Sequence, residues 1–458
     1  MKPLFYTMVA VSLFSVPAIA QDRAAERALL EQVVEIPTVA GRGEMPRLVE
    51  LLRGELGEAG FDEFHVQPHD ETQTLIARRN ADRPSGEDAI LLMAHMDVVD
   101  ANPADWQNPP FEFREEEGYY LGRGIADNKS GLVGMILALQ RIEAAGVPLD
   151  RDIVVLFTGD EETAQEGARL AASEWRDLLG DVDMALNSDG GGGTVFRNGE
   201  VEAFYMQVAE KTYADFTFRA TNRGGHSSAP RPDNAIYQLA GALKNLEEHR
   251  FPQQLNDATR AAFTAVAEND GGGFGQIIQA WLADPENDEL ADQVEAMGPG
   301  QTRTRCVATQ LSGGHAPNAL PQSAEANVNC RIFPGTSIEE IRQTLQDIAG
   351  QFIEVEIVDG NSPGSDATPV DEELVAAYRR AIGTHFADAP IVPFMSAGAT
   401  DGLFIRNAGI RTYGVGGLWS VVGVPTGAHG LDERVLADGF HGSVDIWEAL
   451  LRDVAGAD

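Results

Sequence analysis

The sequence predicts an α/β protein, with a mostly parallel central sheet flanked by helices and a smaller α+β domain of split βαβ (ferredoxin-like) type inserted into it. Three observations lead to this prediction. Short apolar runs alternate with segments of helical spacing, as in parallel sheets covered by helices. Near residue 211 the order becomes β-α-β-β-α-β, and near residue 361 the alternation resumes. The 458 residues are too many for one ordinary domain.

The first twenty residues have the pattern of a secretory signal peptide. Lys2 gives a basic start, residues 4–16 are apolar, and residues 18–20 form an A-x-A cleavage site. A buried N-terminal helix is the alternative, but Pro17 and the cleavage pattern favour processing. The apolar stretch is short for a membrane span, and no later segment is apolar enough to be one. We therefore expect a periplasmic or secreted protein, cleaved after Ala20.

The chain is strongly acidic. Its 34 Lys+Arg and 71 Asp+Glu residues give a formal net charge of −37. This charge argues against nucleic acid as a partner, because phosphate binding needs a basic surface. A hydrophobic fraction of 43% is sufficient for substantial cores, and lysine occurs only at positions 2, 129, 211 and 244.

The main domain is predicted to comprise residues 21–210 and 361–458. Residues 24–60 have helical character, with an interruption near Pro37. Apolar residues between 132 and 142 recur at helical spacing. Three short apolar runs lack a helical stripe and are predicted to be strands of the sheet: Ala89–Met93, Ile153–Phe157 and Val182–Leu186.

Residues 211–360 are predicted to form the inserted domain. Its elements are expected at Tyr213–Ala220 (strand), Asn234–Glu248 (helix), on either side of Gly313–Pro321 (two strands), Ile338–Ile348 (helix) and Phe352–Val358 (strand). An acidic stretch at about 251–303 interrupts this order, and the sequence assigns it no element.

The two cysteines, Cys306 and Cys330, lie in runs that alternate like strands. If these runs form an antiparallel hairpin, the two side chains would lie opposite each other, and export would permit a disulfide. Two small core residues are the alternative.

Polar residues follow each of the three apolar runs of the main domain. His95 and Asp97 follow the first, Glu161 and Glu162 the second, and Asp189 the third. Since ligands of parallel sheets bind beyond the carboxyl ends of the strands, these side chains are expected at one rim. His95 could bind a metal while Asp97 bonds its other ring nitrogen. A polar strand end is the alternative.

The doubled glutamate is the more specific signal. With Asp160 before them, Glu161 and Glu162 would repel one another unless cations or protons relieve the charge. Glu162 would bind metal, and Glu161 would take a proton from the attacking water and pass it to the leaving amine. A solvated acidic loop is the alternative.

Three further residues are less decisive alone. Asp127 precedes an apolar helix, where it is either an N-cap or a carboxylate that bridges two ions. Asp189 precedes four glycines, which let the backbone approach a site closely. His429 lies in a loop, where a histidine is often a surface residue. Together, two histidines and several carboxylates are the ligand set of two divalent ions with a base, and they predict a metal-dependent hydrolase.

The order H-x-D, D, E-E, D, H closely resembles the dinuclear zinc carboxypeptidase and aminoacylase family of the clan MH metallopeptidases. Glutamate carboxypeptidase, acetylornithine deacetylase, succinyl-diaminopimelate desuccinylase and aminoacylase belong to it, and the resemblance covers nearly the whole mature chain. It implies two Zn²⁺ per subunit, although Co²⁺ or Mn²⁺ suit similar ligands. One ion would be held by His95, Asp127 and Asp189, and the other by Asp127, Glu162 and His429. Glu161 would be the base and Asp97 would orient His95.

The resemblance also makes residues 211–360 a lid and dimerisation domain. His226 in Gly224–Ser228 resembles the histidine that stabilises the oxyanion, which in dimeric members comes from the partner subunit. Asn318 and Arg331 match positions that bind the substrate carboxylate. The segment 396–402 resembles a pocket-lining stretch. The insertion at 251–303 could alter the surface through which smaller members of the family pair. A homodimer through the lid is therefore one of the possible oligomeric states.

These implications predict an exported dinuclear-zinc hydrolase that cleaves an amide next to a free carboxylate, of carboxypeptidase or dipeptidase type. Its substrate would be a peptide or an N-acyl amino acid. The alternatives are an N-acyl-amino-acid deacylase of the same family, an aminopeptidase with the same metal core, and a non-catalytic binding protein. The aminopeptidases generally lack the lid. The loop Gly416–Pro425 is expected to influence specificity, with Trp419 either in a pocket wall or in the core.

Overall fold

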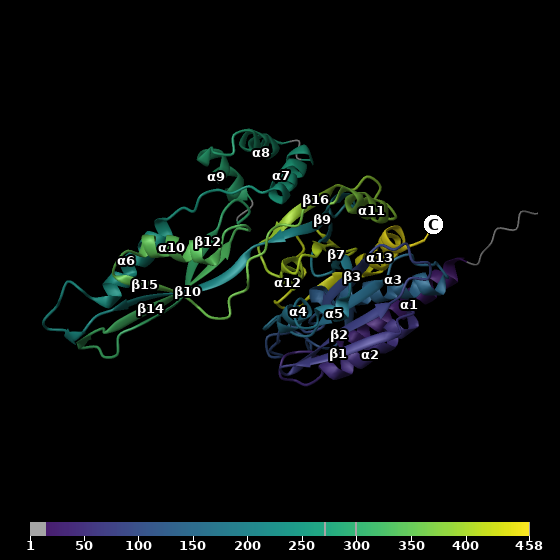
Figure 1. Ribbon diagram of the computed structural model, residues 1–458, viewed down its shortest axis with the longest axis horizontal. Helices are drawn as coiled ribbons and strands as arrows, with labels where there is room; N and C mark the ends of the chain where they lie inside the picture. The colour runs from purple at the N-terminus through teal and green to yellow at the C-terminus, as the bar shows by residue number, and fades with distance from the viewer. Residues whose placement is uncertain (1–14, 270–271, 298–299, 458) are drawn as a thin grey trace, which may run out of the picture.

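The computed structural model describes residues 15–457, apart from 270–271 and 298–299. Most of the predicted signal peptide, residues 1–14, lies outside the described residues. Figure 1 shows a large body and a smaller, elongated one, joined by the long ribbon of β9 (Val201–Glu210) and β10 (Thr212–Thr221). The chain passes from the sheet of the large body to that of the smaller one at Lys211.

The large body, the main domain, is built on a ten-stranded sheet. The strand order is β1-β2-β6-β3-β7-β17-β9-β8-β18, with β16 paired to β9. β3 runs parallel to β6 and to β7, and β7 runs parallel to β17. This mixed, largely parallel sheet confirms the predicted fold class. The remaining strand bounds are β1 (Glu63–His69), β2 (Thr72–Arg79), β3 (Ala89–His95), β6 (Ile153–Thr158), β7 (Val182–Asn187), β8 (Gly192–Val195), β16 (Ile391–Ser396), β17 (Arg411–Gly414) and β18 (Trp419–Val421).

Helices cover both faces of this sheet. Alternate residues of β3 point to opposite faces, so Leu92 joins one apolar core and Leu91 the other. The larger core includes residues of α1 (Ser15–Val34), α2 (Met45–Glu58), α3 (Ser130–Ala144), α11 (Glu372–Ile382) and α13 (Ala437–Ala455). The smaller core includes residues of α4 (Glu166–Ala171), α5 (Arg176–Leu179) and α12 (Gly402–Asn407). A three-stranded sheet of β4 (Arg114–Glu116), β5 (Tyr119–Leu121) and β19 (Arg434–Leu436) lies in the same domain.

The smaller body, which we call the lid domain, follows the predicted β-α-β-β-α-β order. Its antiparallel sheet has the order β12-β14-β10-β15, and two helices pack on it through residues such as Leu239 and Leu345. Cys306 of β12 lies opposite Cys330 of β14, and the two form a disulfide. The bounds are β11 (Gly225–His226), α6 (Ala235–Glu248), β12 (Arg305–Gly313), β13 (Ala319–Leu320), β14 (Ser323–Ile332), α10 (Ile338–Ala349) and β15 (Ile353–Ile357).

The stretch 251–303 forms three helices, α7 (Asp257–Asn269), α8 (Gly273–Ala283) and α9 (Asp288–Met297). They have a small core of their own, in which Trp281 is fully buried beside Phe263. α7 also lies against β16 of the main domain (Figure 1). The insertion therefore contacts the main domain near the β9–β10 connection.

Two of the three lysines in the described part of the chain are buried. Lys129 is 0% exposed, and its Nζ donates to the backbone oxygens of Val33 and Ile36. Lys211 is 1% exposed and donates to the backbone oxygen of Arg303. In both cases, backbone carbonyl oxygens accept hydrogen bonds that water would otherwise accept from the ammonium group. This makes burial of the ammonium group tolerable. Within the described ranges, no helix has the length and apolarity needed to cross a membrane.

Candidate metal centre

Three neighbouring strands end at one rim of the main sheet. β3 lies between β6 and β7, and all three run in the same direction. His95 ends β3, Glu161 and Glu162 follow β6, and Asp189 follows β7. The polar groups that the sequence placed after separate strands are therefore neighbours in space.

His95 is at the centre of the first ligand group. Its Nε2 is 2.9 Å from Asp127 Oδ1 and 3.6 Å from Asp189 Oδ1. The ring is almost fully buried, with 1% of the side chain exposed. Burial alone would lower the pKa of His95, but the charge of Asp189 and the hydrogen bond with Asp127 outweigh burial and raise the pKa.

Asp127 joins the two ligand groups because each of its oxygens faces a different histidine. Oδ1 faces His95, and Oδ2 lies 3.1 Å from His429 Nε2. Burial would raise the pKa of Asp127, but hydrogen bonds from His429 and His95 lower it well below the usual range. The alternative role as a helix cap is not found, because Lys129 occupies the N-cap position of α3. Asp127 thus lies between the two histidines, with one carboxylate oxygen directed at each.

The second group contains His429 and Glu162. His429 Nε2 lies 2.9 Å from Glu162 Oε2. The hydrogen bond with Asp127 and the charge of Glu162 raise the pKa of His429 to about 9. Burial and the nearby charge of Asp127 raise the pKa of Glu162 to about 7.

Glu161 lies beside these groups without a hydrogen bond to either histidine in the described structure. Its Oε1 accepts a hydrogen bond of 2.9 Å from Gln165 Nε2. Burial, followed by the charge of Asp189, raises its pKa well above the usual range. A carboxylate with a raised pKa is suited to accept and return a proton. The contact with Gln165 was not predicted, since a glutamine four residues away has no recognisable pattern.

Asp97 acts differently from the prediction. The Nδ1 of His95 is 3.0 Å from the backbone oxygen of Asp97 and 3.6 Å from its carboxylate. The carboxylate instead accepts hydrogen bonds from the backbone N–H groups of Glu161 at 3.1 Å and Glu162 at 3.0 Å. Asp97 thus fixes the tautomer of His95 through its main chain and holds the two glutamates through its side chain.

Asp160 is separated from the other acids, although the sequence grouped all three. Its carboxylate accepts hydrogen bonds from the backbone N–H groups of Glu166 and Gly167, at the start of α4. The Nδ1 of His69 is 3.7 Å away. Asp160 therefore accepts hydrogen bonds from the first N–H groups of α4. The electrostatic repulsion at the candidate metal centre is among the other carboxylates.

The donor set fits divalent cations. Atoms of His95, Glu161 and Asp189, and separately of His95, Asp127 and Glu162, lie within 4.8 Å of one another. Burial raises the pKa values of Glu161, Glu162 and Asp189, so ionising these groups together is costly without added positive charge. Two divalent ions would supply that charge, and imidazole with carboxylate is a ligand combination that zinc accepts.

The lid residues predicted to bind substrate are not in contact with this centre in the described structure. His226 is exposed on β11, and its Nδ1 accepts a hydrogen bond from the backbone N–H of Ser228. Asn318 is exposed, and its backbone oxygen pairs with Ser227. Arg331 stacks on Tyr213 at 4.7 Å and donates to the backbone oxygen of Ala397 at 3.4 Å. Among the three, only Arg331 contacts the main domain.

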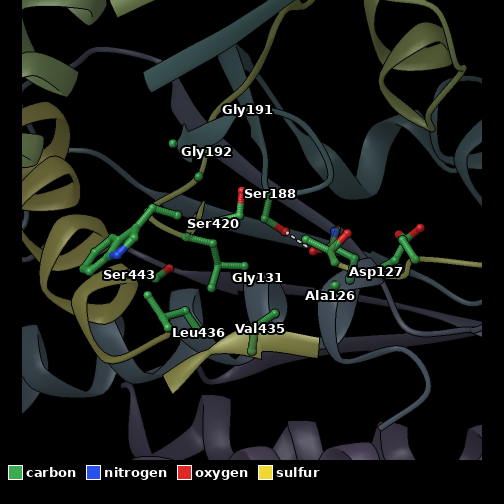
Figure 2. A pocket seen from close by; sticks show the side chains of 18 of the residues that line it. Ala126, Asp127, Gly131, Ser188, Gly191, Gly192, Ser420, Val435, Leu436 and Ser443 are labelled. Atoms are coloured by element: carbon green, nitrogen blue, oxygen red, sulfur yellow. Dashed lines mark hydrogen bonds between the residues drawn. The ribbon is translucent and has the colours of Figure 1, made fainter. Parts of the chain in front are cut away.

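A cavity of about 290 Å³ adjoins the metal centre. Figure 2 shows Asp127 and Ala126 at one side of it and Ser443 and Leu436 at the other. Glycines 190–193, 416 and 417 form part of the wall, and most other lining side chains are apolar. They include Leu418, Trp419, Val421, Val424, Val435 and Trp447. Trp419 is 9% exposed and also packs on Phe386, so it belongs to both the wall and the core.

Comparison with known protein families gives one model match, "Peptidase family M20/M25/M40", over residues 91–453. This span is more than half of the chain and includes His95, Asp127, Glu161, Glu162, Asp189 and His429.

Individual relatives are distant but extend along most of the chain. An N-fatty-acyl-amino acid synthase/hydrolase of Mus musculus is 24% identical over 93% of this chain and 86% of its own. A probable succinyl-diaminopimelate desuccinylase of Staphylococcus epidermidis is 25% identical over 93% and 96%. Among solved structures, an M20 family metallo-carboxypeptidase from Sulfolobus solfataricus has a TM-score of 0.69 at 18% identity, over 93% of this chain and 98% of that one. The structural likeness shows a common fold.

Proposed function

The chain belongs to peptidase family M20/M25/M40, a family of metallopeptidases and amidohydrolases, and on that basis we propose that it hydrolyses the amide bond of N-acyl amino acids that have an apolar acyl group and a free carboxylate. The observation that carries this proposal is the apolar cavity that adjoins Asp127 and Asp189. It favours the deacylase among the alternatives that the sequence left open.

The charges around the cavity support an acyl group over a free α-amine. Asp127 and Asp189 are its only carboxylates among the described lining residues, and both belong to the metal-ligand set. A dipeptide or aminopeptidase substrate would bring its ammonium group into this cavity without a free carboxylate to pair it, which is costly. An acyl chain carries no such charge and gains from burial against Val421 and Leu436. The name of the mouse relative, an N-fatty-acyl-amino acid synthase/hydrolase, agrees with this substrate class.

The proposed cofactor is a pair of zinc ions. His95, Asp127 and Asp189 would hold one ion, and Asp127, Glu162 and His429 the other. Bound there, such ions polarise the scissile carbonyl and lower the pKa of the attacking water. Asp127 has one oxygen directed to each histidine, which suits a ligand shared by both ions.

Glu161 is proposed to move the proton. It would accept a proton from the attacking water and deliver it to the nitrogen of the leaving amino acid. Its raised pKa makes the carboxylate a stronger base toward the attacking water, and the hydrogen bond from Gln165 orients the carboxylate. Asp97 would hold the backbone of Glu161 while this happens.

The lid is proposed to recognise the free carboxylate of the substrate. Arg331 is suited to this by its bidentate guanidinium and by its position beside Ala397 of the main domain. Asn318 and His226 remain proposals from family resemblance, as carboxylate and oxyanion ligands respectively.

We also propose a homodimer formed through the lid. β12 is an edge strand whose Val307 and Leu311 are 60% and 71% exposed, and Ile236 and Tyr237 of the adjacent α6 are 43% and 75% exposed. Exposed apolar groups on an edge strand favour association. Sedimentation velocity of the wild type should give a dimer, and Leu311→Glu should give a monomer. A monomeric wild type would refute the dimer.

Export is the remaining part of the proposal. In a host with a general secretory pathway, the mature protein should begin at Gln21 in an intact-mass measurement. A mass that retains residues 1–20 would contradict cleavage.

The main test compares N-octanoyl-L-leucine with leucyl-leucine, using zinc-loaded protein with and without a chelator. We expect hydrolysis of the acylated compound at higher kcat/KM, and loss of that activity with chelator. Preference for the free dipeptide would favour the dipeptidase instead, and cleavage of neither class would favour a binding protein.

A further inference from the structure

Three buried neutral polar groups around the cavity have no hydrogen-bond partner in the described structure. They are Asn128 Nδ2, Ser443 Oγ and Trp447 Nε1. Their residues are 2%, 0% and 1% exposed. Two of these groups, the amide nitrogen and the indole nitrogen, can only donate, and the hydroxyl can also donate. A buried donor without an acceptor is costly, so three around one cavity indicate a missing acceptor.

Two of the donors come from one helix. Ser443 and Trp447 are one turn apart on α13, so their side chains lie on the same face. Figure 2 shows Ser443 at the side of the cavity away from Asp127. We call this side, defined by Ser443 and Trp447, the inner end.

Asn128 stands nearer to the metal centre, next to Asp127 in sequence. Its Oδ1 accepts a hydrogen bond of 3.2 Å from Ser188 Oγ, the contact drawn dashed in Figure 2. This bond fixes the orientation of the amide and leaves Nδ2 to donate. A side chain at Gly131 would collide with that pair, since its Cβ would lie 2.3 Å from Asn128 Oδ1. The glycine therefore keeps room for the amide at the cavity wall.

Between these two sides the lining is mainly apolar, although Ser420 also lies there (Figure 2). Val435 and Leu436 line the cavity on β19, Val421 is the last residue of β18, and Val424 lies in the loop after it. A ligand that spans the cavity must therefore be apolar in its middle and polar at its end.

We propose that the cavity binds an acyl chain that carries a hydrogen-bond acceptor, received at the inner end by Ser443 and Trp447. The inference deepens the proposed function and rests on it, because it specifies the acyl group of the same substrate. The chain enters past Asp127, runs between the apolar walls, and places an oxygen atom where the two donors meet it. Substrates with an unsubstituted chain leave these donors unpaired and are bound less well.

One cation also lines the cavity. Arg434 on β19 has a buried Nε without a hydrogen-bond partner in the described structure. A neutral oxygen and a carboxylate both accept hydrogen bonds, so the test includes acyl chains that carry a neutral oxygen and one that ends in a carboxylate.

The experiment uses zinc-loaded protein and N-octanoyl-L-leucine, beside analogues with one oxo group at carbon 4, 5, 6 or 7 and the analogue whose chain ends in a carboxylate. At least one acceptor-bearing analogue should have a kcat/KM about tenfold or more above that of the unsubstituted compound. The double variant Ser443→Ala/Trp447→Phe should reduce this ratio to about one.

Matched controls separate the cavity from general destabilisation. Trp281→Phe removes a buried indole whose Nε1 is likewise unpartnered, but in the insertion. Ser173→Ala removes an exposed hydroxyl at the end of α4. Both variants should keep the wild-type ratio. The proposal is overturned if no analogue exceeds the unsubstituted compound, or if the gain survives the double variant. It is also overturned if the gain is lost only in Arg434→Met.

A binding measurement separates this inference from the proposed function. If no N-acyl leucine is hydrolysed, the proposed function fails, and calorimetric titration with octanoic acid and the oxo-octanoic acids still tests the cavity. Tighter binding of an oxo acid that the double variant abolishes would support the inner-end donors. Equal binding of all the acids would refute them.

Discussion

The carboxylate of Glu433 accepts a hydrogen bond of 3.1 Å from the backbone N–H of Asp127. The same carboxylate accepts from the N–H groups of Gly124 and Ala126, and it forms an ion pair with Arg123 at 2.7 Å. Since Glu433 lies four residues after His429, one buried acid connects the backbone around Asp127 to the loop that contains His429.

The Glu433→Ala variant should lose both stability and metal affinity. Breaking a buried ion pair by removing one partner costs about 3–5 kcal/mol, because Arg123 would remain buried and unpaired. Urea unfolding measures the stability and competition with a chelator measures the affinity. Glu354→Ala, on the exposed side of β15, is the control. Unchanged zinc affinity would show that Glu433 does not position Asp127.

Substitutions of Glu161 and of Glu162 should have different effects, one on the catalytic step and the other on metal binding. Glu161→Gln should lower kcat by about 10²–10⁴-fold, because it removes the proton acceptor, and should retain metal. Glu162→Gln should lose metal, because it removes a ligand that contacts His429. Elemental analysis of dialysed protein and initial rates distinguish the two. Loss of metal in Glu161→Gln would assign that residue to the ligands.

Asp97→Ala should weaken the site without removing a direct ligand. The variant leaves the N–H groups of Glu161 and Glu162 without their acceptor, while the backbone oxygen that faces His95 remains. Losing such a supporting contact costs about 10–100-fold in metal affinity or activity. Asp97→Asn keeps one oxygen acceptor and should recover part of the loss. If both variants behave alike, the carboxylate bonds are not responsible.

Without metal, the protein should lose stability as the pH rises. The folded-state pKa values of Glu162, about 7, and His429, about 9, both exceed the ordinary values of these groups, 4.5 and 6.5. The folded protein therefore binds more protons than the unfolded chain between about pH 4.5 and pH 9, and stability falls across that window. Tm measured in chelator from pH 5 to pH 9 should decrease.

Bound zinc should reverse this decrease of Tm with pH. The ligands of zinc must be deprotonated, so the affinity of the protein for zinc increases with pH. The difference in Tm between zinc-loaded and metal-free protein should widen toward pH 9. In metal-free His429→Gln, the part of the decline above pH 6.5 should be reduced. An identical decline in that variant would assign the titration to other groups.

Removing the disulfide should destabilise the lid domain. Cys306 and Cys330 are 24 residues apart, and a crosslink over a loop of this size contributes about 3 kcal/mol by restricting the unfolded chain. The Cys306→Ser/Cys330→Ser variant should unfold at lower denaturant concentration, followed by Tyr213 and Tyr237 fluorescence changes or by proteolysis of the lid. A reducing agent should affect the wild type in the same direction and leave the double variant unchanged.

The parts of the site that could be predicted follow from one geometric rule. Parallel strands end at a common rim, so His95, Glu162 and Asp189 were expected together from three apolar runs alone. Asp127 lies in a short helical turn, Ile125–Lys129, and His429 in a loop. Their positions depend on tertiary contacts, and only family resemblance connected them to the rim.

Other features had no local pattern. Glu433 is one of two adjacent acids in a loop, and its function depends on N–H groups more than three hundred residues earlier in the chain. The side chain of Asp97 was expected to bond His95, because residue type alone does not show that its backbone would do so. The helices of 251–303 were missed because the acids and glycines of this segment were taken to exclude a regular element, although buried residues such as Ile278 and Trp281 recur at helical spacing. Ser443 and Trp447 were not predicted, because both lie among the buried residues of α13 and no local pattern distinguishes them.

The burial of lysines has a practical consequence for chemical labelling. In a chain processed after Ala20, the lysines would be Lys129, Lys211 and Lys244, and only Lys244 is exposed, with 59% of its side chain accessible. The terminal amine has a lower pKa than lysine and reacts first near neutral pH, so once it is blocked, an amine-reactive dye would attach mainly to α6 of the lid domain. A fluorophore at that position would be one member of a donor–acceptor pair for measuring the distance between the two bodies, without any engineered cysteine and without disturbing the Cys306–Cys330 disulfide.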